Sequence, residues 1–325
     1  MISSHQATPL SPVPTPKSLF CNRLIEGSNI EVKVLNKIDA GKFFIFLAKD
    51  VHTDKNYAMK VFPQKDGKIN ELYKNEKKFM KYKHEHVINI IDSKDDYFIM
   101  IDGVPVKCSY VLMEYAPHKD FLNMLLEREI TLDDKMARTY FHQLIEGLEY
   151  LHSQGVYHLD IKLDNLLVGE DYQLKIADFD ISYIKEEGSM ITSRGTKCYR
   201  APELARGRCA QPELADVFSA GVLLFNLKTG GFIPYSEEKS SRGVDFYPLL
   251  KEESPKFWEF HCLYQKKSPD FFDEEFKELF LSMVKTDSTK RATIEDVKKS
   301  KWYNGPIYSK EEMIEIMRSK YAVVA

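Results

Sequence analysis

The order of secondary-structure signals restricts the fold more than any other feature of this sequence. Runs rich in β-branched and aromatic residues predict strands at 31–38, 42–49, 56–62, 97–101 and 110–115. A helical pattern at 68–82 interrupts them, and a longer one at 132–154 begins with two aspartates and precedes a glycine. We therefore expect an α+β fold with two lobes: a small β-rich N-lobe with one main helix, and a larger, mostly helical C-lobe.

Composition divides the chain into a folded part and two tails. Residues 1–29 are dominated by proline and small polar residues, which bury too little surface to fold alone, so this tail is expected to be disordered. We expect one folded domain at 30–303, with the N-lobe at about 30–115 and the C-lobe at about 116–303. Residues 304–325 are expected to be a tail whose short helix, at 310–317, packs on the large lobe.

Three Thr-Pro or Ser-Pro pairs lie in the first tail: Thr8-Pro9, Ser11-Pro12 and Thr15-Pro16. They are compatible with a plain flexible tail and also with targets of proline-directed phosphorylation.

Charge and cysteine usage exclude several classes of protein. The formal net charge is −3, so no overall basic field indicates a nucleic-acid partner. No apolar run is long enough to span a bilayer. The five cysteines are scattered and odd in number, which argues against a disulfide framework and a zinc knuckle: Cys21, Cys108, Cys198, Cys209 and Cys262. A reducing, intracellular and cytoplasmic location is the simplest interpretation.

A glycine-bearing turn between the first two predicted strands, at 38–46, is the first candidate for phosphate binding. Such a turn can bring backbone N–H groups close to phosphates. The next strand ends in Lys60, which can hold phosphates as a point charge, and Glu76 on the following helix is placed to orient it. Taken alone, Lys60 and Glu76 are more readily explained as two solvated surface charges on separate elements.

The stronger candidate site follows the long helix, in the segments 158–165 and 175–180. Phosphoryl transfer requires in-line positioning and neutralised charge rather than covalent chemistry. Asp160 can orient an attacking hydroxyl and accept its proton, and Lys162 can hold the transferred phosphate. Asn165 and Asp178 offer hard oxygen ligands for Mg²⁺. An Asp/Asn-rich turn capping a hairpin would explain the acids and the amide, but not Lys162 as well.

With these residues in view, the segment from Ile30 to Tyr303 resembles the eukaryotic protein kinase family. Further landmarks follow in the family's order: Gly195-Thr196, Ala201-Pro202-Glu203, Asp216, Arg291 and Lys301-Trp302-Tyr303. Lys162 and Thr196 resemble Ser/Thr kinases rather than Tyr kinases. The surroundings of Phe257-Trp258 resemble the calcium/calmodulin-dependent and SNF1-related branch. The implied partners are ATP, Mg²⁺ and protein substrates with Ser/Thr acceptors, and the oligomeric state stays open.

The resemblance also implies roles for individual residues. Asp160, Lys162 and Asn165 are implied to be catalytic, and Asn165 and Asp178 to bind the metal. Met113 resembles the gatekeeper, Glu114 to Ala116 the hinge that binds adenine, and Asp120 a ribose contact. The implied nucleotide contacts are Ile38, Asp39, Gly41, Phe46, Ala58, Lys60, Glu76, Met113, Glu114, Ala116, Asp120, Leu167 and Asp178. Met80, Phe179 and His158 resemble a hydrophobic stack.

Three departures from the family pattern bear on activity. Asp39 and Phe44 stand where glycines are usual, and their side chains restrict close backbone approach, so we expect weakened ATP affinity. Leu159 replaces an arginine that pairs with a phosphate on the activation segment, so phosphorylation at Ser189, Thr192 or Ser193 is not expected to be strictly required. Asp180 replaces a glycine, which either adds a carboxylate near the metal or locks the loop in one orientation.

The sequence therefore leaves more than one function open. All six polar residues implied to act at the site are present, which favours an active Ser/Thr kinase: Lys60, Glu76, Asp160, Lys162, Asn165 and Asp178. The three departures favour a pseudokinase that acts as a scaffold or nucleotide-gated binding module. A small-molecule kinase is disfavoured because the segment from Thr196 to Glu203 resembles a peptide-docking platform. Asp164 is compatible with a contact to a substrate arginine and with a solvated loop acid.

Overall fold

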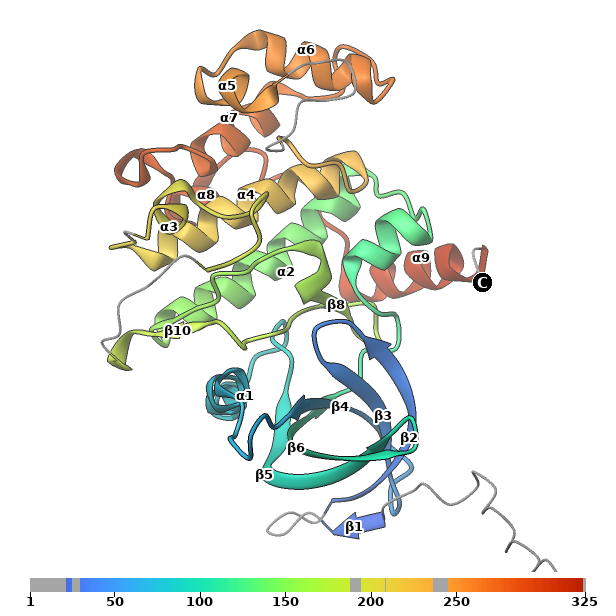
Figure 1. Cartoon of the computed structure of the whole chain (residues 1–325). Helices are drawn as coiled ribbons and strands as arrows, with labels where there is room; N and C mark the ends of the chain where they lie inside the picture. The colour runs from blue at the N-terminus through green and yellow to red at the C-terminus, as the bar shows by residue number, and fades with distance from the viewer. Residues whose placement is uncertain (1–21, 25–29, 188–193, 208, 236–244, 324–325) are drawn as a thin grey trace, which may run out of the picture.

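The computed structural model describes residues 22–24, 30–187, 194–207, 209–235 and 245–323. Figure 1 shows the large β-sheet and α1 on one side of the molecule, and the helices from α2 to α9 on the other. The α+β, two-lobed fold expected from the sequence is therefore confirmed.

The small lobe is built on one antiparallel sheet of six strands in the order β1-β2-β3-β4-β6-β5. The strands are β1 (Asn22–Leu24), β2 (Glu31–Ala40), β3 (Phe44–Asp50), β4 (Asn56–Pro63), β5 (Ile90–Ile101) and β6 (Val104–Glu114). A tight turn at Asp102-Gly103 joins β5 to β6, and both residues have positive φ, as the dipeptide predicts. β5 begins well before the expected 97, because two register shifts let its polar first half stay paired with β6.

Part of the expected N-terminal tail belongs to this sheet. β1 pairs antiparallel with β2, from Asn22 opposite Lys33 to Leu24 opposite Glu31. The expectation of disorder over all of 1–29 was therefore wrong for these three residues. The rest of that tail, with its three proline-directed pairs, lies outside the described residues.

The two faces of the sheet belong to different cores because successive side chains of a strand point to opposite sides. One face packs a small cluster of its own that includes Val32, Phe46, Ala48 and Met59. The other face, which includes Ala58 and Met113, joins the main core that continues through the large lobe. The second face therefore carries the surface that a ligand between the lobes would meet.

The helix of the small lobe is shorter than predicted. α1 covers Glu71–Glu76 and continues as a 3-10 helix, η1, at Lys77–Lys81. Asn70 caps the N-terminus of α1 by accepting a hydrogen bond from the Leu72 N–H, so the helix begins later than the predicted 68. Glu76 at the last α-helical position is completely buried.

The large lobe is mostly helical. Its α-helices are α2 (Asp134–Ser153), α3 (Pro202–Ala205), α4 (Pro212–Thr229), α5 (Phe246–Lys251), α6 (Pro255–Tyr264), α7 (Glu274–Met283), α8 (Ile294–Lys299) and α9 (Lys310–Val323). Short elements complete it: η2 (Asn123–Glu127), η3 (Leu163–Asn165), η4 (Lys185–Glu187), η5 (Ser288–Lys290), β7 (Val156–Tyr157), β8 (Leu166–Val168), β9 (Leu174–Ile176) and β10 (Tyr183–Ile184).

α4 is the buried axis of this lobe. Its sequence is apolar on nearly every side, as expected of a helix surrounded by protein. Gly221 allows α7 to approach closely, because a Cβ there would lie 2.9 Å from Met283 Cβ. Asp216 near the start of α4 accepts hydrogen bonds from the backbone N–H groups of His158 (2.8 Å) and Leu159 (2.7 Å). The expected brace from Asp216 to the segment 158–165 is therefore confirmed.

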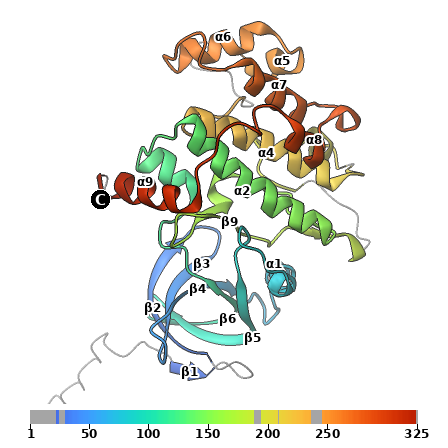
Figure 2. The same cartoon turned by 180° about the vertical axis from the view of Figure 1, so that it is seen from behind.

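The C-terminal helix packs on the large lobe, as expected, and extends beyond the predicted 317. Figure 2 shows α9 beside the connection between the lobes. Met313 and Met317 are fully buried, and the Tyr321 ring packs against His118 and Tyr172. Lys310 at its start lies 2.9 Å from Glu85 and 2.7 Å from Asp171.

Cys108, Cys198, Cys209 and Cys262 carry free thiols, and Cys21 lies outside the described residues. No helix in the described ranges is both long and apolar enough to cross a bilayer.

A buried ion pair joins α3 to the end of the large lobe, at the positions that the family resemblance indicated. Arg291 places its guanidinium nitrogens 2.5 and 3.0 Å from the two carboxylate oxygens of Glu203. The Arg291 side chain is completely buried, and it also donates to the carbonyls of Leu214 and Lys285.

We predict that Arg291→Ala lowers the free energy of unfolding by about 3 kcal/mol or more, because it leaves the mostly buried Glu203 carboxylate without its partner. Urea unfolding followed by tryptophan fluorescence measures this. Lys290→Ala, which removes an exposed neighbouring cation, is the control and should cost far less. Equal losses in the two variants would contradict the structural role of the pair.

Candidate active site

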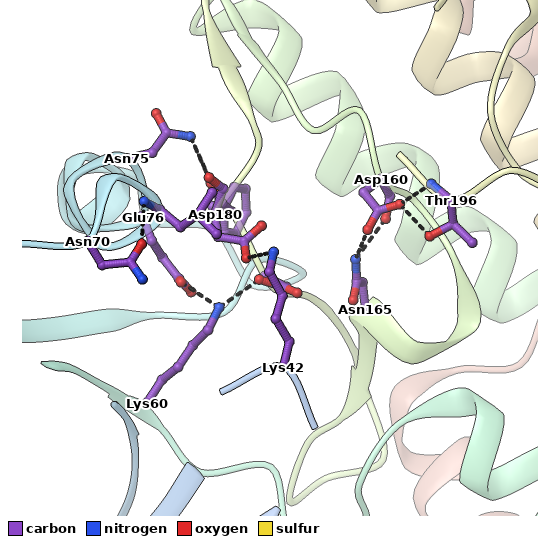
Figure 3. A network of polar contacts seen from close by, with 12 residues as sticks. Lys42, Lys60, Asn70, Asn75, Glu76, Asp160, Asn165, Asp180 and Thr196 are labelled. Atoms are coloured by element: carbon purple, nitrogen blue, oxygen red, sulfur yellow. Dashed lines mark hydrogen bonds and ion pairs between the residues drawn. The ribbon is translucent and has the colours of Figure 1, made fainter. Parts of the chain in front are cut away.

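Lys60 is the centre of a buried charge cluster formed by three distant segments (Figure 3). Its Nζ, from β4, lies 2.5 Å from Glu76 Oε2 at the end of α1 and 2.6 Å from Asp178 Oδ1 after β9. Burial lowers the pKa of Lys60, but the carboxylates of Glu76 and Asp178 more than offset this and raise it overall. Burial also opposes ionisation of Asp178, yet the Lys60 ammonium holds its pKa below the usual value. The ion pair expected between Lys60 and Glu76 is present, with Asp178 as a third member.

A second polar group surrounds Asp160. Asp160 Oδ1 accepts hydrogen bonds from the backbone N–H (2.7 Å) and the hydroxyl (2.8 Å) of Thr196. Lys162 Nζ lies 3.2 Å from Asp160 Oδ2 and 3.1 Å from the Thr196 hydroxyl. Asn165 donates its amide N–H groups to the Asp160 carbonyl (2.9 Å) and to Oδ2 (3.1 Å). The three residues expected to be catalytic are thus in mutual contact around one carboxylate.

Ala177 connects the two groups. Its N–H donates to the Asn165 carbonyl (2.9 Å), and its own carbonyl lies 2.9 Å from His158 Nε2. His158 is completely buried and fixed at this position, which fits the structural role expected for it. Asp178 follows Ala177 directly, so the Lys60 cluster and the Asp160 cluster are held side by side.

The segment around Thr196 needs its glycine. Gly195 has φ 86°, and a Cβ there would lie 2.5 Å from the Leu159 carbonyl oxygen. A side chain would therefore push Thr196 away from Asp160.

The residues expected to hold magnesium fit that ion by donor chemistry. Because the Asn165 amide nitrogen donates to Asp160, its carbonyl oxygen is left as the group that can act as a ligand. Asp178, which is only partly exposed, supplies a carboxylate. Among the described residues no group of three or more His, Cys, Asp and Glu side chains forms a metal site. Magnesium takes few protein ligands and completes its shell with phosphate oxygens and water, so this sparse donor set suits it.

The residues expected around adenine line the connection between the lobes. Ala58 on β4 pairs directly with Met113 on β6, and both are buried on the face of the main core. Leu167 on β8 is half-buried and forms a β-bridge with Asp120. Asp120 also has a structural contact, because its Oδ1 accepts a hydrogen bond from the Asn123 N–H at 2.8 Å.

Glu114 and Ala116 form the chain between the lobes, but the Glu114 side chain points toward Asn89 and Lys175. The Glu114 N–H also donates to the Asn89 carbonyl (2.9 Å), so the backbone carbonyl is the group of Glu114 left for a hinge contact. Glu114 and Ala116 also line a cavity of about 700 Å³, together with Asn56, Ile314 and Arg318. Lys60, Asp160 and Asp178 do not line that cavity, so it shares only the hinge residues with the site.

The turn at 38–46, the phosphate turn, departs from the expectation in one residue. Phe46 was expected to contact a nucleotide, but it packs with the small-lobe cluster on the far face of the sheet and pairs with Met59. Strand alternation is the reason, since Ile45 pairs with Lys60 on the near face and takes the place expected for Phe46. Phe43 also lies on the near face, with its ring centroid 5.2 Å from Lys60 Nζ.

The other turn residues are exposed. Ile38 and Asp39 are on the surface, and Gly41 does not have positive φ. A Cβ at Gly41 would meet only Asp39 Oδ2, at an ordinary 3.6 Å. Nothing within the protein therefore requires glycine at 41, which leaves close approach of a ligand as a reason for it.

Two residues that sequence reasoning missed hold the loop after Asp178 in place. Asn75, next to Glu76 on α1, donates to the carbonyls of Phe179 (3.2 Å), Asp180 (3.1 Å) and Ser182 (2.8 Å). Lys42 in the phosphate turn places its Nζ 2.7 Å from Asp180 Oδ2. Adjacency to Glu76 was the only signal for Asn75, and nothing in the sequence linked positions 42 and 180.

Asp180 itself adopts an ordinary backbone conformation, whereas Asp178 has φ 67°. Burial and the neighbouring Asp178 charge raise the pKa of Asp180. Of the two alternatives for this residue, a loop held in one orientation agrees with the contacts of Asp180 to Asn75 and Lys42.

Leu159 is buried and cannot bind a phosphate, as expected. Arg194, which directly precedes Gly195-Thr196, instead donates to the backbone carbonyls of Ile181 (2.8 Å) and Ser182 (3.3 Å). Ser189, Thr192 and Ser193 lie outside the described residues.

The hydrophobic stack is present with one difference. The Phe179 ring stacks on Phe79 (centroids 4.7 Å apart) and meets His158 edge to face (5.0 Å). Met80, which was expected in the stack, is partly buried against the same core. The sequence pattern did not indicate that Phe79 takes part.

Comparison with known proteins identifies the family. The protein kinase domain model matches residues 32–303. The chain is 30% identical over 271 residues to CBL-interacting protein kinase 11 of Oryza sativa subsp. japonica, covering 81% of this chain and 49% of that protein. It is 27% identical over 304 residues to CBL-interacting serine/threonine-protein kinase 13 of Arabidopsis thaliana, covering 89% and 55%.

A third relative is the carbon catabolite-derepressing protein kinase of Secale cereale, 29% identical over 274 residues, covering 80% of this chain and 48% of that protein. The chain thus spans about half the length of the curated relatives it matches. These similarities confirm the resemblance to Ser/Thr kinases of the SNF1-related branch. The chain belongs to the protein kinase domain family.

Proposed function

We propose that this chain is an active Ser/Thr protein kinase that transfers the γ-phosphate of Mg-ATP to serine or threonine hydroxyls of protein substrates. The observation that carries the proposal is the convergence of Lys60, Asp160, Lys162, Asn165 and Asp178 from separate segments. A scaffold without phosphotransfer would not need to keep all of them in contact. A cytoplasmic, intracellular location is part of the proposal and is supported by the free thiols.

The Asp160 group is arranged to position a hydroxyl. Asp160 Oδ1 accepts a hydrogen bond from the Thr196 hydroxyl, with the two oxygens 2.8 Å apart. Lys162 Nζ lies 3.1 Å from that hydroxyl oxygen. A substrate hydroxyl that contacts Asp160 in the same way would be oriented for attack and would pass its proton to the carboxylate. Lys162, whose pKa Asp160 keeps raised against burial, stays protonated and can stabilise the charge on the transferred phosphate.

The Lys60 group is arranged to hold the nucleotide. Lys60 can bind phosphate oxygens while Glu76 fixes the direction of its ammonium. Asn165 and Asp178 would hold magnesium, which would supply charge neutralisation to the phosphates. The backbone of Glu114 and Ala116 and the side chains of Ala58, Met113 and Leu167 would surround adenine. Phe46 is omitted from this set because it faces the other side of the sheet.

Asp160→Asn tests this proposal. We expect it to lower phosphate incorporation into a generic protein substrate by about 100-fold or more, because the amide cannot accept the hydroxyl proton. Labelled Mg-ATP with purified wild type and variant measures the effect. Asp270→Asn, which alters an exposed acid, is the control and should keep full activity. Incorporation at background level in the wild type would instead favour the scaffold.

Asn75 and Arg194 supply a second prediction, because they hold the metal-binding loop with hydrogen bonds that need no phosphate. We expect Asn75→Ala to speed amide hydrogen exchange across 177–184 and to lower activity. Phosphatase treatment of the wild type should leave most activity. Lys74→Ala, an exposed neighbour paired with Glu71, is the matched control. Unchanged exchange in Asn75→Ala, or activity abolished by phosphatase, would contradict this account.

A further inference from the structure

Two lysine ammonium groups lie near a single aromatic ring beside the proposed nucleotide site. The Phe43 ring centroid lies 5.2 Å from Lys60 Nζ and 5.2 Å from Lys42 Nζ. The faces of an aromatic ring carry partial negative charge, so cations gather around it. The ring also packs on Phe62, with centroids 4.5 Å apart. Both ammonium groups thus lie near the same neutral ring of the protein.

Each of the two lysines is held by a carboxylate from another segment. Glu76 holds Lys60, and Asp180 holds Lys42 with Nζ and Oδ2 2.7 Å apart (Figure 3). The Asp180 side chain is only 3% exposed, so an unpaired charge there would be costly. Lys42 is 57% exposed and keeps freedom to move at its stem. An ammonium has three N–H donors, so the contact with Asp180 leaves donors for another anion.

The residues of the turn at 38–46 indicate what the pair of Lys42 and Asp180 does in this site. Asp39 and Phe44 replace glycines, which limits the approach of backbone N–H groups to a phosphate chain. Asp180 also adds a negative charge beside Asp178, which by itself would repel a triphosphate. Lys42 compensates for both effects at once, since it neutralises Asp180 and offers donors from the turn.

We propose that Lys42 is a second phosphate-binding lysine of this site, and that Asp180 positions it as Glu76 positions Lys60. On nucleotide binding, phosphate oxygens contact both ammonium groups. Asp180 is a positioning residue, because it acts through Lys42. This inference rests on the proposed function as a nucleotide-binding kinase.

A double-mutant cycle in nucleotide binding tests the inference. Calorimetric titration of the full chain would compare wild type, Lys42→Ala, Asp180→Asn and the double variant with Mg-ATP, Mg-ADP and adenosine. We expect Lys42→Ala to weaken Mg-ATP binding about tenfold or more, since one charge-assisted contact is lost and Asp180 is left unpaired. Adenosine binding should change less than about twofold, because adenosine has no phosphate to contact.

The decisive result is whether the effect of removing Lys42 depends on the residue at position 180. In the Asp180→Asn background, removal of Lys42 should cost at least about threefold less than in the wild type, because no unpaired carboxylate is left facing the phosphates. The matched control is the pair Lys49 and Asp54, 2.7 Å apart on β3 and the following turn, whose cycle should leave Mg-ATP binding unchanged. Thermal melting of each variant verifies folding, and Lys42→Arg should retain most of the affinity as a charge-preserving variant.

Several outcomes would overturn the inference. Loss of the same factor on Lys42→Ala in both backgrounds would show that the pair does not act together. Equal weakening of adenosine and Mg-ATP would indicate a general structural effect. If the wild type binds Mg-ATP and the cycle is additive, this inference alone fails; if the wild type binds no Mg-ATP, the proposed function fails with it.

Discussion

The arrangement of the whole site depends on one buried ammonium group. Lys60 can remain charged in the interior only because carboxylates from α1 and from the loop after β9 contact it together. Removing one partner from such a cluster costs several kcal/mol, because a charge is left buried and unpaired. The contact therefore fixes α1 against the sheet and the loop after β9 against both. The Asp160 group follows, since Ala177 links the two through the backbone.

Much of this arrangement could be predicted from the sequence because it depends on residue types at ordered positions. The meeting of Lys60, Glu76 and Asp178 was foreseeable through the family resemblance, because the sequence offers many other charged partners and charge alone does not choose among them. The face of the sheet on which Phe46 lies could not be predicted, because it depends on the register of β3. A one-residue change in register moves a side chain to the other face. The link between Lys42 and Asp180 was hidden for a similar reason, since side chains 138 residues apart meet only in the folded chain.

The departures from the family pattern are compensated locally. Where glycines are missing from the phosphate turn, Lys42 brings a side-chain cation to the site. Where Leu159 removes a phosphate partner, Arg194 and Asn75 hold the same loop through its carbonyl oxygens. These contacts lie within the described chain and require no modification. They agree with a catalytic arrangement that is assembled by the fold itself.

Electron paramagnetic resonance of Mn²⁺, used in place of Mg²⁺, tests the central claim most directly: that these side chains surround a triphosphate and its cation. The account predicts a protein-bound Mn²⁺ signal that requires ATP, because two protein ligands alone hold the ion weakly. Asp178→Ala should abolish this signal, and Asp270→Asn should preserve it. Equal Mn²⁺ binding without nucleotide, or an undiminished signal in Asp178→Ala, would contradict the account.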